Sequence, residues 1–241
     1  MKKFICAEEL EVLCESVVKD FFRRKHYTNS LCVDIEALAS DYFCAPVVYE
    51  AFAEEDPNRI GFLSDGERPL LVRRENAIMQ LTFPLKTIVI EKYLLHPRES
   101  ARRRFTIAHE AGHLLLHLHI PIQASPVAAF HGEFDDEMGY TRDALQEMFS
   151  LNECLANRAS ACLLMPHFLV LRVLKRFNAG KKVILYNGTI LSQDQKLLVQ
   201  RMADAMGVSY TAFFNRLREL SLFEHRAVEE YLHQGLGFGG V

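Results

Sequence analysis

The sequence predicts an α+β fold, in which a small, largely antiparallel sheet packs on a core of helices and a helical part follows at the C-terminal end. Three observations support this fold class. Apolar residues recur at helical spacing near the beginning of the 241-residue chain and again throughout its second half. Between these segments lie short runs rich in β-branched residues, and turn signals separate them. The connections between the runs are short, which favours antiparallel pairing.

The predicted elements follow one another in a clear order. Residues 7–25 predict a first helix, and the residues after Asp34 predict a second, short one. Four β-rich runs then predict strands, at residues 47–49, 60–63, 70–72 and 87–90. Helical spacing returns at residue 98 and continues until Pro121. After a loop, a further helix is predicted over residues 142–165, and most of the chain beyond it reads as helical.

The length of the chain suits one compact unit with a smaller appendage. We expect residues 1–170 to hold the first helix, the small sheet and the helical core, and residues 171–241 to form a helical subdomain. The formal net charge of -3 argues against a dedicated nucleic-acid-binding protein, because such proteins usually carry a basic balance. Nothing in the sequence indicates an oligomeric state.

Cysteine usage and hydrophobicity indicate the compartment. The six cysteines are Cys6, Cys14, Cys32, Cys44, Cys154 and Cys162. They include no Cys-x-x-Cys pair and the chain opens without a secretory signal, so we expect reduced thiols in a reducing compartment. No apolar stretch reaches the ~18 residues needed to cross a bilayer. The sequence therefore predicts a cytoplasmic protein without a membrane-spanning segment.

The most informative motif is His109-Glu110-Ala111-Gly112-His113. Two histidines four residues apart on a helix lie on the same face, so both imidazoles can reach one metal ion at Zn–N distances of ~2.1 Å. Glu110 follows the first ligand and can take a proton from water beside the metal. The alternative is a pair of histidines that simply line an apolar helix. Gly112 costs a helix about 1 kcal/mol, so we expect another element to approach closely there.

A catalytic zinc ion needs a third protein ligand. His117 lies ~12 Å along the helix from His109, which is too far for the two to share a metal. The spacing leaves several other candidates open, namely His119, His131, Asp135, Asp136 and Glu153. Glu153 belongs to the next predicted helix, and Asn157 follows it by one turn on the same face.

Residues 104–113, Arg-Phe-Thr-Ile-Ala-His-Glu-Ala-Gly-His, resemble the signature of the ImmA/IrrE metallopeptidases, and residues 153–166 are similar to the second block of that family. The resemblance covers roughly residues 34–220. It implies a zincin-like core of the gluzincin type, with Glu153 as the third metal ligand. The chain departs from the family pattern at Ala159, Ser160 and Cys162, which concern packing near the ligand helix. The loop between the two blocks is also longer than usual, which affects the shape of the substrate cleft.

The resemblance implies a zinc-dependent endopeptidase. His109, His113 and Glu153 would hold Zn²⁺, and Glu110 would carry a proton from water to the leaving nitrogen. The substrate implied is a regulatory protein, a transcriptional repressor that is cut at a specific site. A further donor should stabilise the oxyanion, and Tyr140, His131 and His167 all stay open for this role. Asn157 is expected either to accept a ligand N–H or to serve in helix packing.

A second motif lies at residues 202–210, which resemble the turn of a helix-turn-helix. Gly207 would form the turn and Ser209 would cap the following helix. That helix is rich in Phe, whereas a DNA-reading helix offers polar and basic side chains to the groove. We therefore favour a packed helical subdomain. The alternative function is a DNA-binding transcriptional regulator with a degenerate metal site, in which Arg216 and Arg218 would contact DNA.

Overall fold

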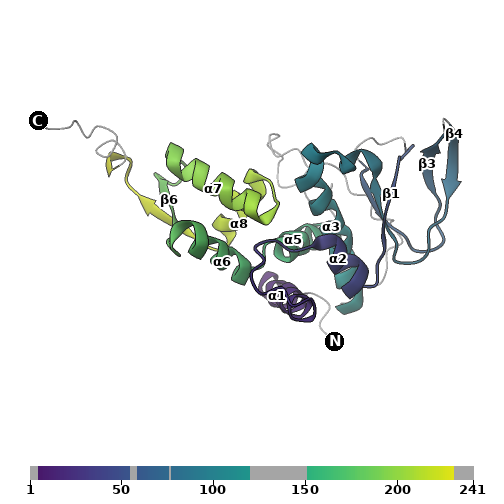
Figure 1. Ribbon diagram of the computed structural model, residues 1–241, viewed down its shortest axis with the longest axis horizontal. Helices are drawn as coiled ribbons and strands as arrows, with labels where there is room; N and C mark the ends of the chain where they lie inside the picture. The colour runs from purple at the N-terminus through teal and green to yellow at the C-terminus, as the bar shows by residue number, and fades with distance from the viewer. Residues whose placement is uncertain (1–4, 55–58, 76, 120–150, 231–241) are drawn as a thin grey trace, which may run out of the picture. The chain divides into compact units, whose positions relative to one another are not determined.

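The computed structural model describes residues 5–54, 59–75, 77–119 and 151–230, and Figure 1 shows the course of the chain. The chain divides into two compact units, Met1–Pro166 and His167–Val241. Helices and small sheets are both present, so the predicted α+β class is confirmed. Within the described ranges, no single helix is long and apolar enough to cross a membrane. The neighbouring helical segments Glu153–Leu164 and His167–Asn178 reach that length and apolarity only when they are counted together.

The first unit begins with α1 (Ala7–Arg24), as the apolar spacing predicts. Cys6 caps its N-terminus, because its Sγ accepts the Glu9 N–H while the Glu9 carboxylate accepts the Cys6 N–H. One face of α1 is buried and consists of Leu10, Cys14, Val17, Val18, Phe21 and Phe22. The buried Cys14 thiol lies 3.9 Å from the Ala159 carbonyl oxygen, so this face packs on a later helix of the same unit.

The short helix expected after Asp34 is present as α2 (Ile35–Ala37), and it continues into the π-helical turn η1 (Leu38–Tyr42). The Asp34 side chain caps α2 by accepting the Ala37 N–H at 3.1 Å.

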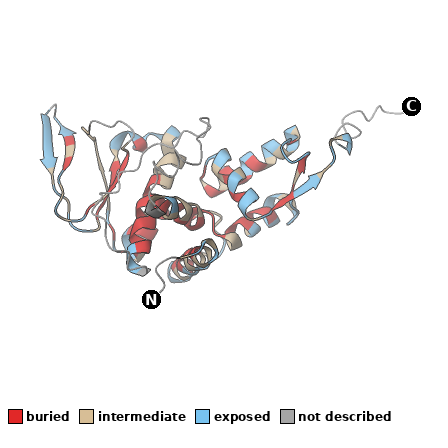
Figure 2. Ribbon diagram, turned by 180° about the vertical axis from the view of Figure 1, so that it is seen from behind, coloured by how far each residue is buried: buried red, intermediate tan, exposed pale blue. Residues whose placement is uncertain are grey.

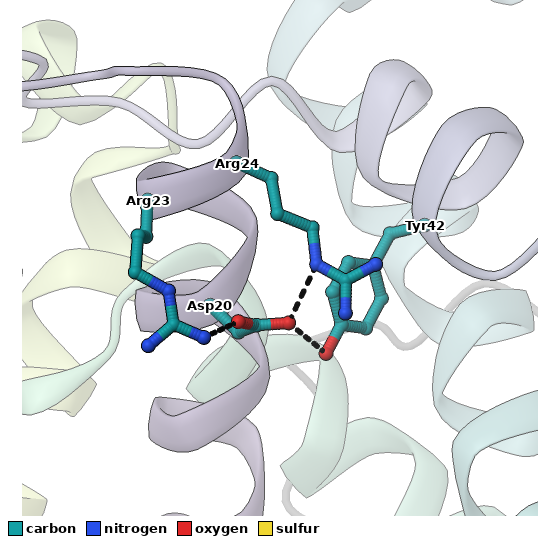
Figure 3. A network of polar contacts seen from close by, with 4 residues as sticks. All are labelled: Asp20, Arg23, Arg24 and Tyr42. Atoms are coloured by element: carbon teal, nitrogen blue, oxygen red, sulfur yellow. Dashed lines mark hydrogen bonds and ion pairs between the residues drawn. The ribbon is translucent and has the colours of Figure 1, made fainter.

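A polar network joins α1 to η1 (Figure 3). The Asp20 carboxylate accepts hydrogen bonds from the Tyr42 hydroxyl at 3.0 Å and from Arg24 at 2.8 Å, and it also pairs with Arg23. Desolvation opposes ionisation of Asp20, but the Tyr42 hydrogen bond and the two arginines outweigh it and lower the pKa of this carboxyl. The network therefore holds the end of α1 against η1.

The main sheet has three strands in the order β1-β5-β2, formed by Val47–Glu50, Ile88–Glu91 and Gly61–Leu63. β2 runs antiparallel to β5, whereas β1 runs parallel to it. The parallel pair was not predicted, because the connections between successive runs are short. β1 and β5 are not successive, however, and the intervening strands give the chain the length that a parallel return requires.

A two-stranded antiparallel ribbon, β3 (Leu70–Arg74) and β4 (Ala77–Leu81), lies between β2 and β5 in the sequence. Its buried face joins the main sheet in one apolar cluster of Phe62, Leu70, Val72 and Val89. This cluster packs the ribbon against β2 and β5.

Two 3₁₀ turns, Lys92–Leu95 and Pro97–Glu99, lead from β5 into α3 (Ser100–His119), which packs on α5 (Leu151–Leu164). The two helices approach closely at Gly112. A Cβ atom at this position would lie 3.0 Å from the Ala156 carbonyl oxygen and 3.1 Å from the Ala159 Cβ. The close approach expected from this glycine is therefore confirmed.

The second unit contains α6 (His167–Asn178), α7 (Gln193–Met206) and α8 (Tyr210–Glu219). It also contains two short strands that the sequence reading missed, β6 (Val183–Tyr186) and β7 (Phe223–Arg226), which pair in parallel. The run Val-Ile-Leu-Tyr of β6, followed by Asn-Gly, carried the signal for the first of them.

Candidate metal centre

The three predicted site residues of the His-Glu-x-x-His motif lie on α3, in its buried middle part. Residues 106–116 of this helix are all buried, and Figure 2 shows them as the red stretch between exposed or partly exposed ends. His109 and Glu110 have no exposed surface, and His113 is 6% exposed. Helical periodicity places the two histidines on one face, and their rings meet edge to face at a centroid distance of 4.7 Å.

α5 brings Glu153 to the same place. Its Oε2 lies 3.2 Å from His109 Nε2, and its Oε1 lies 3.4 Å from His113 Nε2. The two Nε2 atoms are 3.0 Å apart. The structure thus brings together the two histidines and the glutamate, which are separated in the sequence and belong to two helices.

The geometry of this group fits a metal ion. Ligand atoms arranged tetrahedrally at ~2.1 Å from zinc lie roughly 3.4 Å from one another. The three distances, 3.0, 3.2 and 3.4 Å, are close to this separation. Among the described residues, His109, His113 and Glu153 form the group of three metal-ligating side chains that could share one ion. Two imidazoles and a carboxylate are a donor set that zinc accepts in catalytic sites.

Asn157 lies one turn after Glu153 on α5 and contacts the first histidine. His109 Nδ1 is 2.9 Å from Asn157 Oδ1, so the ring donates its Nδ1–H to the amide oxygen and turns Nε2 toward the site. Such a partner fixes both the tautomer and the orientation of a ligand imidazole. Of the two roles that the sequence left open for Asn157, this contact supports the orienting role.

The protonation states of His109 and Glu153 also favour binding of a metal cation. Burial lowers the pKa of His109 and outweighs the hydrogen bond to the Glu153 carboxylate that would raise it, so the ring is neutral near pH 7. Burial opposes ionisation of Glu153 as well, but the adjacent imidazoles of His109 and His113 outweigh it and hold the pKa of this carboxyl well below its usual range. Neutral imidazoles and an ionised carboxylate are the forms that bind metal.

Glu110, the carboxylate of the motif, takes no part in the contacts among the three ligand residues that the structure shows. Neither of its oxygens has a hydrogen-bond partner among the described residues, although the side chain is completely buried. Burial raises the pKa of Glu110 well above its usual value, and the charge of Glu153 raises it further. A buried carboxyl group without partners is costly. It is suited to exchange a proton with a molecule that enters the site.

Gly61 is a site residue that the sequence reading missed. It lies on β2, opposite α3, and a Cβ atom at this position would come within 2.6 Å of Glu110 Oε1 and of Thr106 Cγ2. A signal was present, because a glycine inside the apolar run Ile60-Gly61-Phe62 indicates close approach of a neighbouring element.

The remaining candidates have different positions. His117 Nδ1 lies 3.2 Å from the His113 carbonyl oxygen, so it bonds to the helix backbone, as its distance along the helix predicted. His131, Asp135, Asp136 and Tyr140 lie outside the described residues, as does the side chain of His119. His167 is the first residue of α6, in the second unit.

The helix-turn-helix-like segment is present in the second unit. Gly207 ends α7 in the left-handed conformation at φ 66°, and the Ser209 hydroxyl caps α8 by accepting the Ala212 N–H at 3.1 Å. The two arginines considered for DNA contact are engaged by neighbours on α8. Arg216 is buried and pairs with Glu219 at 3.1 Å, and the Arg218 guanidinium stacks 5.0 Å above Phe214. These contacts support a packed helical subdomain.

Comparison with known families gives an independent result. The sequence model of peptidase family M78, described as the IrrE N-terminal-like domain, matches residues 75–218. The matched segment includes α3 and α5 and therefore all three residues that could hold the metal. No curated protein matches the chain.

Proposed function

Because the chain belongs to the IrrE N-terminal-like family of metallopeptidases, we propose that it is a zinc-dependent endopeptidase. The observation that carries this proposal is the convergence of His109, His113 and Glu153 beside a buried carboxyl group, Glu110, that has no hydrogen-bond partner among the described residues. A scaffold alone has no need for this combination, whereas metal-assisted hydrolysis of a peptide bond uses each part of it.

The metal would be held by Nε2 of His109, Nε2 of His113 and the carboxylate of Glu153. When bound, zinc would supply a Lewis acid that polarises the peptide carbonyl and lowers the pKa of water toward ~7. Asn157 keeps the His109 ring oriented through the 2.9 Å contact at Nδ1.

Glu110 is the general base in this proposal. Its carboxylate takes a proton from the attacking water, and the protonated carboxyl then gives this proton to the leaving nitrogen. Burial raises the pKa of this carboxyl, and a carboxylate whose conjugate acid has a raised pKa is a stronger acceptor for the proton of the attacking water.

We further propose that the enzyme acts in the cytoplasm and that its substrate is a regulatory protein of the repressor type. The resemblance of residues 104–113 and 153–166 to the ImmA/IrrE metallopeptidases supports the choice of substrate, and the cysteine usage supports the compartment. The second unit also favours a protein partner over DNA, because Arg216 and Arg218 on α8 are engaged by Glu219 and Phe214.

Metal content and cleavage of a synthetic peptide library test the proposal together. We expect about one zinc ion per wild-type chain by mass spectrometry and cleavage at a narrow set of sequences. Glu110→Gln should retain the zinc and lose cleavage by a factor of roughly 10² or more. The exposed Glu67→Gln is the matched control and should behave as wild type.

Two results would contradict the proposal in different ways. If the protein takes up no zinc near neutral pH, the chain is not a zinc enzyme. If Glu110→Gln retains cleavage, the metal site stands but Glu110 is not the general base.

A further inference from the structure

We propose that Gly61 is a positioning residue for catalysis, because the space left by its missing side chain is the slot that holds the Glu110 carboxylate. The inference deepens the proposed function and rests on it for its catalytic part. The slot itself is a matter of packing between β2 and α3, so it can be tested without any substrate.

The distances leave no room for a side chain at this position. A Cβ atom on residue 61 would lie 2.6 Å from Glu110 Oε1 and 2.6 Å from Thr106 Cγ2. Cβ atoms in proteins essentially never lie within 3.0 Å of such atoms, so a neighbour would have to shift, and close-packed interiors transmit the resulting strain. An alanine at position 61 and Glu110 in its present orientation therefore exclude each other.

β2 cannot move away easily. Gly61 pairs with Ile90 in the antiparallel register, and hydrogen bonds flank this pair on both sides. The Glu91 N–H donates to the Ile60 carbonyl at 2.9 Å, and the Ser64 N–H donates to the Thr87 carbonyl at 2.8 Å. The next residue of the strand, Phe62, is buried in the apolar cluster that the sheet shares with the β3–β4 ribbon.

α3 is equally fixed. It crosses α5 at Gly112, two residues from Glu110, with only 3.0 Å between the position of a Cβ and the Ala156 carbonyl oxygen. Thr106, one turn before Glu110, is fully buried, and its hydroxyl donates to the Arg102 carbonyl at 3.0 Å. Since these contacts hold both backbones while Glu110 Oε1 is the far end of a flexible side chain, a methyl group at residue 61 would turn the Glu110 side chain out of its slot.

The consequence is specific to the proton-transfer step. The nearest atoms that an added Cβ would meet belong to Thr106 and Glu110, and neither residue is among the three that could hold the metal. Gly61→Ala should therefore leave zinc affinity unchanged. A misplacement of about 1 Å at a reacting group costs roughly 10²-fold in rate, so kcat should fall by about that factor while KM stays near the wild-type value.

A double-mutant cycle on unfolding tests the slot itself. Gly61→Ala is made in the full-length wild type, in Glu110→Ala and in Thr106→Ser, and the midpoint of urea unfolding is measured for each metal-free protein. We expect Gly61→Ala to lower the midpoint in the wild type and to lower it much less once the Glu110 carboxylate is absent. The Thr106→Ser background shows separately how much of the loss comes from the Cγ2 methyl group.

The outcomes separate the possible roles of Gly61. Additive effects of Gly61→Ala and Glu110→Ala would overturn the proposal, since the two positions would then not compete for space. A fall in zinc affinity, measured by competition with a chromophoric chelator, would also overturn it, because the glycine would then serve the metal site as a whole. If Gly61→Ala alone does not fold, its combination with both Glu110→Ala and Thr106→Ser must fold, because this combination removes both atoms that the added Cβ would meet; failure of this combination contradicts the slot.

The catalytic arm uses the synthetic peptide library. If the wild type cleaves no peptide, the proposed function fails while the unfolding cycle still decides the slot. If the wild type is active and Gly61→Ala is equally active, the positioning role fails while the proposed function stands.

Discussion

Two pairs of packed helices, α3 with α5 and α7 with α8, bury charged or polar side chains in different ways. In the first pair, ring nitrogens and carboxylate oxygens from two helices converge at His109, His113 and Glu153. In the second pair, the buried Arg216 meets Glu219 on its own helix, three residues away. The first region collects donor atoms from two helices around a common point, and the second pairs its buried charge with a residue of the same helix.

This difference distinguishes a site from a scaffold. A buried charge that is paired on its own helix needs nothing from outside the chain. Converging ligand atoms are expensive to bury, as are the oxygens of Glu110, which have no hydrogen-bond partner among the described residues; both persist where an external group completes them. Hence we expect substitutions at α3 and α5 to change ligand binding and chemistry, and substitutions at α8 to change stability.

Loss of the third ligand should have the largest effect. Glu153→Ala leaves two imidazoles from one helix to hold the ion, so zinc affinity should fall by more than ~100-fold, beyond what changes around the ligands usually cost. Metal content after gel filtration measures this. Glu219→Ala removes a glutamate from α8 as the control and should leave the metal content at its wild-type value. An equal loss of zinc in both variants would contradict the distinction between the α3–α5 site and α8.

Asn157→Ala should have the next largest effect on the metal. The ligand atoms stay in place, but His109 loses the acceptor at 2.9 Å that orients its ring, so zinc affinity should fall by roughly 10-fold to 100-fold. Asn157→Asp keeps an oxygen acceptor and should recover most of the affinity in the chelator competition. Unchanged affinity in Asn157→Ala would mean that this side chain serves packing only.

Arg216→Ala should act on stability alone. It removes a fully buried side chain and its ion pair from α8, and the cost should be about 2 kcal/mol, below that of a fully buried pair because Glu219 is 41% exposed. Urea unfolding followed by circular dichroism measures the loss. Arg218→Ala, which loses only a stacking contact on an exposed side chain, is the control and should cost less than about 1 kcal/mol. A loss of zinc in Arg216→Ala would break the division between the two regions.

The smallest effect concerns the Asp20 network, which like α8 satisfies its charge locally. The pKa of Asp20 is lowered in the folded state, so its contribution is present above the unfolded value of ~3.9 and is lost as the pH falls through the folded pKa. Asp20→Asn should therefore have a lower urea midpoint than the wild type at pH 6. The two midpoints should become equal as the pH falls below the folded-state pKa of Asp20. A difference that does not shrink on acidification would assign the effect to packing.

Local periodicity was enough to predict α3 and the shared face of His109 and His113, since both follow from the helical repeat. Apolar spacing also located α1, and the motif at residues 202–210 located the Gly207 turn, because a turn at a left-handed glycine is a local property. Geometry alone left the third ligand open. Glu153 was selected by family resemblance, and its approach to the histidines depends on how α5 crosses α3, which no local pattern encodes.

Tertiary pairing explains two of the features that were not predicted. β1 and β5 pair in parallel although each neighbouring connection is short, because strands between them carry the chain away and back. The role of Gly61 depends on a side chain that follows far later in the sequence, on a different element. A glycine within a strand is a visible signal, but its partner is known only once β2 and α3 are packed.

The crossing of α3 and α5 has a further consequence for the stability of the protein. A zinc ion held by both helices would be a cross-link, closing a long chain loop and removing freedom from the unfolded ensemble. Its binding energy would then be part of the folding energy, and the midpoint of unfolding would rise with the free zinc concentration. The supply of zinc would thus control the amount of active enzyme in two ways. It would set the fraction of chains with an occupied site, and it would set the fraction of chains that are folded.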